Sequence, residues 1–407
     1  MGELRQTQTV SGGRVKQRQF KGRVFVLLLM LKMKTSRAHI ILLLLAGAFS
    51  ITQCKDDPPV QEPTTIGTPA PLKRPAGFPP LNIPANNPQT VEGVELGRHL
   101  FYDKKLSADL SMSCSSCHEQ FRAFGDADPT SEGVDGQRGR RQSMVLFNLV
   151  FQKEFFWDGR AKSLEEQSLH PIIDPLELNT TLPTVIGRLE ADAEYPDMFK
   201  AAFGDQNITE QRIGKAIAQF ERTMISANSE FDRVKRMSGD IDAPFTEDPN
   251  TPGSKNRGFE IFSSEIGDCF HCHSVDADGA FLGGGFGVDG QYLNNGLKMD
   301  YSTDEGRKEV TGLQSDWGKF KVPSVRNIEF SAPYMHDGSI PNLDSLIGFY
   351  NFGGFLNGNT DPNMKFAGPQ MGNRNFSQQE ILDLKEFIGT LTDYELLENP
   401  AFSDPHE

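Results

Sequence analysis

The sequence predicts a mostly helical protein with two domains of similar size. Apolar residues recur at helical spacing, as they do on the face formed by Ile213, Ala216, Ile217 and Phe220. Strand-like alternation of apolar and polar residues is scarce. An internal repeat indicates two related domains, because residues 96–101 (Leu-Gly-Arg-His-Leu-Phe) and 257–262 (Arg-Gly-Phe-Glu-Ile-Phe) each precede a Cys-x-x-Cys-His motif.

The last helix has the clearest local signals. Ser377 and Glu380 form a capping box, in which each residue satisfies a backbone N–H of the other. A stripe of apolar residues at helical spacing follows, namely Ile381, Leu384, Ile388 and Leu391. We therefore expect a helix that begins just after Ser377 and buries this stripe.

The beginning of the 407-residue chain reads as an export signal. Residues 1–54 contain a short apolar run, residues 40–45, which follows Lys34 and Arg37. The run leads to Cys54 in a segment that resembles a lipoprotein processing site, so we expect Cys54 to be lipidated. The alternative is a plain signal peptide with an incidental cysteine. A good signal peptide already begins at Met33, which makes Met33 an alternative start.

Three further segments follow the signal. Residues 55–80 are rich in proline and lack periodicity, which predicts a tether. Residues 81–240 are expected to form an N-terminal domain and residues 241–407 a C-terminal domain, with a soft stretch at 238–252 between them. We call these domains the N-terminal half and the C-terminal half.

The charge of the exported body limits its partners. Removing residues 1–53 removes nine basic residues and one acidic residue, which takes the net charge from −14 to −22. Such an acidic protein is not expected to bind nucleic acid and favours a basic redox protein as partner, although acidity also serves solubility alone. The signal predicts a periplasmic protein of a Gram-negative-type bacterium, attached to a membrane only through its lipid anchor.

Two motifs of the form Cys-x-x-Cys-His carry the chemistry. They consist of Cys114, Cys117 and His118 in the N-terminal half and of Cys269, Cys272 and His273 in the C-terminal half. This pattern predicts covalent c-type haem attachment, with two thioether bonds and the histidine as an iron ligand. Disulfides or thioredoxin-like sites are the alternatives, and two copies that both end in histidine disfavour them. We expect each domain to wrap around one covalently bound haem.

Four segments around these motifs resemble the bacterial di-haem cytochrome c peroxidase and MauG family. They are residues 96–106, 156–161 (Phe-Trp-Asp-Gly-Arg-Ala), 321–327 (Lys-Val-Pro-Ser-Val-Arg-Asn) and 332–338 (Ala-Pro-Tyr-Met-His-Asp-Gly). The resemblance implies a peroxidatic N-terminal haem and a C-terminal haem that relays electrons. It implies that Trp157 lies between the two haems. Without the resemblance, Trp157 would read as an ordinary core aromatic.

The resemblance also assigns the groups of the peroxide pocket. Glu177 matches the acid that moves the peroxide proton, and Gln167 and Pro171 match its neighbours in the pocket. On spacing alone, Glu177 would read as a solvated loop carboxylate. Many family members block the first iron with a histidine from the following loop, but residues 119–156 contain none. We therefore expect an open first iron, with His170 as a hydrogen-bonding neighbour.

The resemblance places Tyr350 as the sixth ligand of the second iron, where many peroxidases have methionine. An ordinary core tyrosine is the alternative, since Tyr350 shares a helical stripe with Leu343, Leu346 and Ile347. Nearby methionines remain candidate ligands, namely Met335, Met364 and Met371. The family commonly holds a calcium ion, and the matching positions here are Gln142, Ser331 and Pro333.

The resemblance implies that this protein is an enzyme, a peroxidase that reduces hydrogen peroxide with electrons from a small protein such as cytochrome c or a copper protein. The alternatives are a MauG-like oxidase, which Tyr350 favours, and a di-haem electron carrier, which Glu177 and Gln167 disfavour. The sequence does not decide between a monomer and a homodimer.

Overall fold

The computed structural model describes residues 66–273, 291–364 and 374–407, which belong to one compact unit, Pro63–Glu407. Several sequence expectations lie outside the described residues. These are the signal segment with Met33 and Cys54, the first part of the tether, and Met371 as a candidate ligand. Within the described residues, the fold is mostly helical with little sheet, as expected.

The N-terminal half contains six α-helices in its described part. They are α2 (Val91–Tyr102), α3 (Leu164–Gln167), α4 (His170–Ile173), α5 (Leu182–Glu190), α6 (Tyr195–Phe203) and α7 (Glu210–Thr223). The longest of them, α7, begins where the Thr209 side chain accepts a hydrogen bond from the backbone of Arg212. Its predicted apolar face is confirmed, since Ile213, Ala216 and Phe220 are completely buried.

The C-terminal half has five α-helices and two short strands in its described part. The helices are α8 (Lys255–Phe262), α9 (Lys308–Thr311), α10 (Leu343–Phe352), α11 (Gln378–Gly389) and α12 (Tyr394–Glu398). The strands β1 (Tyr292–Leu293) and β2 (Phe320–Lys321) pair antiparallel. The capping box predicted at Ser377 and Glu380 starts α11.

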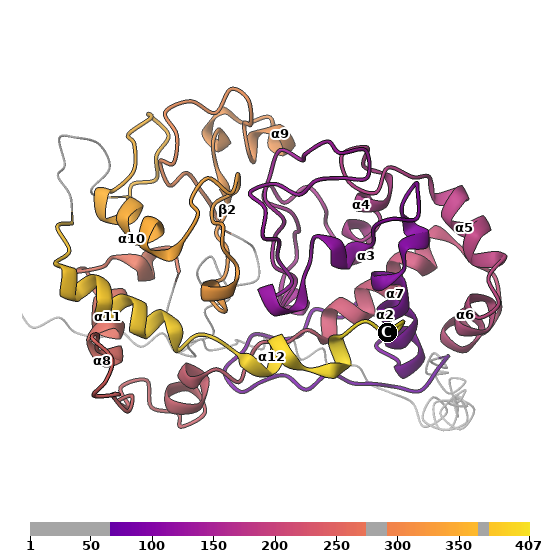
Figure 1. Ribbon diagram of the computed structural model, residues 1–407, viewed down its shortest axis with the longest axis horizontal. Helices are drawn as coiled ribbons and strands as arrows, with labels where there is room; N and C mark the ends of the chain where they lie inside the picture. The colour runs from indigo at the N-terminus through magenta and orange to yellow at the C-terminus, as the bar shows by residue number, and fades with distance from the viewer. Residues whose placement is uncertain (1–65, 274–290, 365–373) are drawn as a thin grey trace, which may run out of the picture. The chain divides into compact units, whose positions relative to one another are not determined.

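The repeated segments form the same helix crossing in each half. Figure 1 shows α2 beside α7 and α8 beside α11, and both pairs are in contact. A Cβ at Gly97 of α2 would lie 1.9 Å from the carbonyl oxygen of Ala216, and one at Gly258 of α8 would lie 2.0 Å from that of Asp383. Each glycine therefore lets two helix backbones touch, and this close crossing holds the helix that leads into each cysteine motif.

Two segments outside these helix pairs pack onto the body. Residues 66–80, which the sequence assigns to the tether, make backbone hydrogen bonds to the start of α2 and bury Phe78 against Phe151. A proline-rich segment packs here because it carries this one large apolar ring. The C-terminal residues reach the N-terminal half, where Arg98 donates to the carbonyl of Ser403 at 2.8 Å.

No helix in residues 66–273, 291–364 and 374–407 is long and apolar enough to cross a membrane.

Candidate active site

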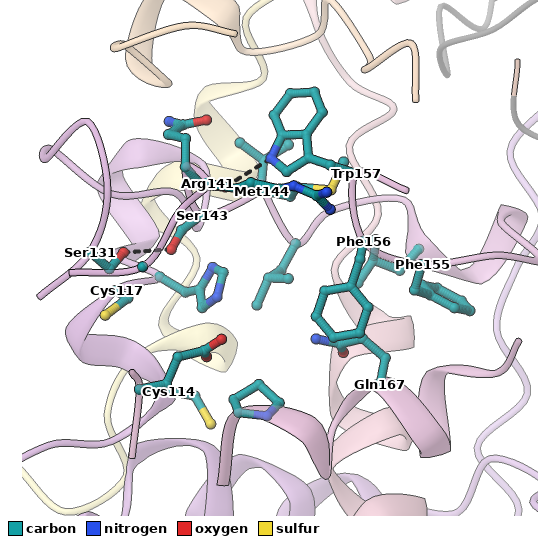
Figure 2. Close-up of a pocket in the computed structure, with 18 of the residues that line it drawn as sticks. Cys114, Cys117, Ser131, Arg141, Ser143, Met144, Phe155, Phe156, Trp157 and Gln167 are labelled. Carbon is teal, nitrogen blue, oxygen red and sulfur yellow. Dashed lines mark hydrogen bonds between the residues drawn. The ribbon is translucent and has the colours of Figure 1, made fainter. Parts of the chain in front are cut away.

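A cavity of about 440 Å³ lies around the first cysteine motif. It is lined by Cys114, Cys117 and His118 of the motif, by Trp157, and by all three predicted pocket residues, Gln167, Pro171 and Glu177. Figure 2 shows Gln167 and Phe156 across the open space from Cys114 and Cys117. Residues far apart in the sequence thus meet around one space.

The first motif starts with a tight turn. Residues Cys114–Ser116 form a 3₁₀ helix, which Ser113 and Ser116 cap reciprocally. The backbone N–H of His118 then donates to the carbonyl of Cys114 at 3.1 Å. This turn brings both cysteines and the histidine into the lining of the cavity.

His118 is prepared to bind a metal. Its Nδ1–H donates to the carbonyl oxygen of Phe124 at 2.8 Å, which leaves the lone pair of Nε2 available. Burial lowers the pKa of His118 below its usual range. The imidazole is therefore neutral at physiological pH, which is the form that binds iron.

The second motif repeats this arrangement. Cys269–His271 form a 3₁₀ helix, and the Nδ1–H of His273 donates to the carbonyl oxygen of Pro323 at 3.2 Å. Burial lowers the pKa of His273 to about 4. Pro323 comes from the segment 321–327 that carries the family resemblance, so that segment orients the second histidine.

The polar atoms of the cavity wall fit a bound haem and its ligand. The side-chain oxygen Oε1 of Gln167 is buried and has no hydrogen-bond partner among the described residues. Such an atom is expected where a bound molecule supplies the partner. Together with two cysteines and a neutral histidine in the same lining, it makes the donor set that a c-type haem needs.

Glu177 is one of the acids that line this cavity. It is half-buried, and its backbone N–H donates to the carbonyl of Asp174 at 3.0 Å. Burial, assisted by the Asp174 carboxylate and opposed by Arg160, raises the pKa of Glu177 to about 7. A carboxyl with this pKa exchanges protons readily at neutral pH, unlike the solvated loop carboxylate that spacing alone suggests.

Trp157 is buried between residues of both halves. Its indole Nε1–H donates to the carbonyl of Gln142 at 2.8 Å, and its own carbonyl accepts from the backbone N–H of Lys321 at 2.7 Å. Figure 2 shows Trp157 at one end of the cavity beside Met144 and Arg141. The next residue, Asp158, is held by an ion pair of 2.6 Å with Arg141.

The expected calcium positions Gln142 and Pro333 are in direct contact. The amide Nε2 of Gln142 donates to the carbonyl oxygen of Pro333 at 2.8 Å. Calcium binds oxygen atoms, so it would need the amide turned with its oxygen toward this carbonyl. The third position, Ser331, lies in the same turn, and its hydroxyl donates to the carbonyl of Ile328 at 3.4 Å.

Tyr350 lies on α10 near the second motif. Burial raises the pKa of its phenol to about 12, and the nearby thiols of Cys272 and Cys269 contribute to this shift. Asn295 hydrogen-bonds the Tyr350 side chain, and its Nδ2 also donates to the sulfur of Met335 at 3.3 Å. Both candidate ligands are therefore close to the same asparagine. Met364 is also buried.

His170 lies outside the cavity wall. Its ring packs edge-on against Phe156 at 5.5 Å, and its Nε2 lies 3.9 Å from a carboxylate oxygen of Glu166. His170 is absent from the lining of the cavity, whereas its neighbour Pro171 contributes to it.

Sequence reasoning missed one buried acid of this cavity, Glu221. Burial raises the pKa of Glu221 to about 8, and its Oε2 has no partner among the described residues. The signal was present, because Glu221 follows the buried Ile217 by one helical turn on α7. Another charged residue adjoins Glu221 in the sequence, so this part of the helix resembles an exposed face.

Comparison with known proteins identifies the family. The sequence profile described as di-haem cytochrome c peroxidase matches residues 91–240. The cytochrome c551 peroxidase of Nitrosomonas europaea is 33% identical over 313 residues, which cover 76% of this chain and 83% of that protein. The chain belongs to the di-haem cytochrome c peroxidase and MauG family. Membership confirms the resemblance drawn from the four segments, and it implies haem as cofactor.

Two further relatives of the di-haem peroxidase come from the MauG branch. The methylamine utilization protein MauG of Methylophilus methylotrophus is 34% identical over 282 residues, which cover 69% of this chain and 77% of that protein. A crystal structure of a MauG-like protein associated with microbial copper homeostasis superimposes with a TM-score of 0.71 at 32% identity, covering 83% of this chain and 100% of that chain. The fold is therefore that of a di-haem peroxidase or MauG-like protein.

Proposed function

We propose that this enzyme reduces hydrogen peroxide to water with electrons from a small redox protein, either a cytochrome c or a copper protein. The observation that carries the proposal is Glu177, a carboxyl with a pKa of about 7 in the cavity that also holds His118 and the first two cysteines. An electron carrier needs no such acid, which disfavours the carrier function.

When bound at His118, a haem supplies the iron that binds and reduces peroxide. The carboxylate of Glu177 accepts the proton from one oxygen of the peroxide and returns it to the other oxygen, which leaves as water. The unpartnered Oε1 of Gln167 accepts a hydrogen bond from the bound peroxide and orients it. In total, one peroxide, two electrons and two protons give two waters.

We further propose that both haems are covalently bound, one in each half, at 81–240 and 241–407. The matching geometry of His118 and His273, each with Nδ1 on a backbone carbonyl, supports two similar iron sites. Trp157 makes hydrogen bonds to both halves, which suits it to carry electrons from the second haem to the first.

A MauG-like oxidase is the second candidate function. The placement of Tyr350 near Cys269 and Cys272 favours it, since an anionic oxygen ligand lowers the potential of the second iron. Met335 lies beside the same asparagine as Tyr350 and would instead favour an ordinary peroxidase. The identity of this ligand therefore separates the two functions.

Export, a lipid anchor at Cys54 and a periplasmic location remain proposals from the sequence. Calcium at Gln142, Ser331 and Pro333 is also a proposal, which elemental analysis of the purified protein tests. Whether the protein is a homodimer is decided by its mass in solution.

Steady-state peroxide consumption with a panel of reduced small cytochromes and copper proteins tests the main proposal. We expect rapid turnover with at least one of them. Oxidation of a partner protein or an organic molecule, without turnover from any small redox protein, would favour the MauG-like function.

A further inference from the structure

One buried cation of the active-site cavity has no anion beside it. Lys321 lines the cavity and is only 6% exposed. Its Nζ donates to the side-chain oxygen Oε1 of Gln152 at 2.9 Å and to the backbone carbonyl of Glu154, and both acceptors are uncharged. An ammonium has three N–H groups, and the third has no acceptor among the described residues. A buried charge is costly unless an opposite charge compensates it, so Lys321 needs an anion.

The nearest carboxylate is already engaged by other cations. The side chain of Glu154 forms ion pairs with Lys162 at 2.5 Å and with Arg307 at 3.1 Å. Burial lowers the pKa of Lys321 to about 8, although the more distant charges of Glu154 and Asp158 oppose this shift. Among the described residues, Lys321 forms no ion pair of its own. The folded chain therefore leaves the charge of Lys321 without a partner.

Two arginines of the same lining differ from Lys321 in this respect. Arg140 forms an ion pair with Glu309 at 2.8 Å. Arg141 forms one with Asp158 at 2.6 Å. The protein thus supplies carboxylates to these cations of the cavity and supplies none to Lys321. This difference indicates that a molecule bound in the cavity brings the missing anion.

The position of Lys321 selects the part of a bound haem that it meets. The two thioether bonds of a c-type haem lie at one edge of the ring, and its two propionate carboxylates lie at the opposite edge. Figure 2 shows Cys114 at one end of the open space and Trp157 with Arg141 at the other. The backbone N–H of Lys321 donates to the carbonyl of Trp157, so this lysine belongs to the end away from Cys114. A haem attached at the first motif therefore turns its carboxylates toward Lys321.

We propose that Lys321 binds a propionate carboxylate of the first haem and compensates its charge. The inference rests on the proposed covalent haem at the first motif. A positive charge beside a buried haem favours ferrous over ferric iron, because the added electron is attracted to it in a site of low dielectric constant. Lys321 is thus a positioning residue that fixes the propionate edge and raises the reduction potential of the first haem.

Spectroelectrochemical titration of the holoenzyme, without peroxide, tests the role of the charge. Lys321→Met keeps a long side chain without the charge and should lower the potential of the first haem by about 59 mV or more, a tenfold change in the ratio of ferric to ferrous haem. Lys321→Arg should keep most of the wild-type potential. Lys200→Met, a change at an exposed lysine of α6, is the control and should not alter it. The Cys114→Ser/Cys117→Ser variant assigns the two potentials, because it retains only the second haem.

Three results would overturn the proposal. The first is an unchanged potential of the first haem in Lys321→Met. The second is an equal shift in Lys321→Arg, since the lysine would then act through packing and not through its charge. The third is a larger shift at the second haem, which would assign the lysine to the other cofactor. The titration needs no peroxide, so its failure leaves the peroxidase function standing, and a protein that does not turn over peroxide can still give the expected potentials.

Resonance Raman spectroscopy of the wild-type holoenzyme and of Lys321→Arg covers the case in which Lys321→Met does not fold. The bending mode of a haem propionate shifts with the hydrogen bonds that its carboxylate accepts. A guanidinium donates two parallel hydrogen bonds to a carboxylate, whereas an ammonium acts as a point charge, so the exchange should shift this mode. Identical propionate modes in the two proteins would show that Lys321 meets no propionate.

Discussion

The backbone N–H of Lys321 donates a 2.7 Å hydrogen bond to the carbonyl of Trp157. The indole of the same tryptophan donates to the backbone of Gln142 at 2.8 Å. Because backbone atoms of the partners make both contacts, the position of Trp157 depends on the path of two distant segments and not on any one partner side chain. The residue proposed to link the two haems is thus held rigidly from both halves.

The two cysteine motifs lead us to expect two covalent haems. Intact mass and in-gel haem staining of the denatured protein should show both, and a Cys114→Ser/Cys117→Ser variant should retain one. A wild-type mass that carries one haem or none would contradict this expectation.

Replacement of Glu177 by glutamine should lower peroxide turnover by about a hundredfold to ten-thousandfold, the usual loss when a general acid–base is removed. Both haems should remain attached, since the amide keeps the shape of the side chain. Glu190→Gln is the matched control, because Glu190 is exposed on α5 and absent from the cavity wall. Near-full turnover in Glu177→Gln would show that Glu177 is a solvated loop carboxylate with no part in proton transfer.

The pKa of about 7 at Glu177 predicts a pH limb in kcat/KM. The carboxylate must be free to accept the peroxide proton, so the rate should rise with pH up to about 7 and level off above it. Below that pH the carboxyl is protonated, and the rate should fall about tenfold per unit. Glu190→Gln should keep this limb and Glu177→Gln should lose it. A limb that survives in Glu177→Gln would assign the titration to another group, with Glu221 the first candidate.

Low-temperature paramagnetic resonance of the oxidised protein should show one high-spin haem and one low-spin haem. The high-spin haem is expected because residues 119–156 contain no histidine that could block the first iron. The low-spin haem is expected because Tyr350 is the predicted sixth ligand of the second iron. Tyr350→Phe should change only the low-spin signal, and Met335→Leu should leave it unaltered. The reverse pattern would identify methionine as the ligand. Two low-spin signals would mean that another residue blocks the first iron, with His170 the first suspect.

The helix crossing at Gly97 predicts a large difference between two glycine substitutions. Gly97→Ala should destabilise the protein by about 1–3 kcal/mol or more, since the new methyl would meet the Ala216 backbone. The new methyl group of Gly187→Ala in α5 would have no other atom within 4 Å. This substitution should raise the free energy of unfolding by up to about 1 kcal/mol, because alanine favours the helix more than glycine does. Urea unfolding of the holoprotein measures both changes. Equal effects at the two sites would show that the crossing has room for a side chain.

The sequence by itself determined the local chemistry of this protein. The capping box of α11 and the apolar stripe of α7 could be predicted because each depends on residues within a few positions of one another. The two cysteine motifs predict haem attachment for the same reason, and that attachment stays a prediction. The family resemblance supplied the roles proposed for Glu177 and Gln167, and both residues line the cavity.

Only the tertiary structure decided which distant residues meet. The indole of Trp157 donates to the backbone carbonyl of Gln142, and the carbonyl of Trp157 accepts from the backbone N–H of Lys321. Trp157 and Trp317 share one hydrophobic cluster although 160 positions separate them. Most of these residues lie in loops, whose path has no periodicity and follows from packing against the rest of the fold. The raised pKa values of Glu177 and Glu221 also depend on the tertiary structure, because burial and neighbouring charges exist only once the chain has folded.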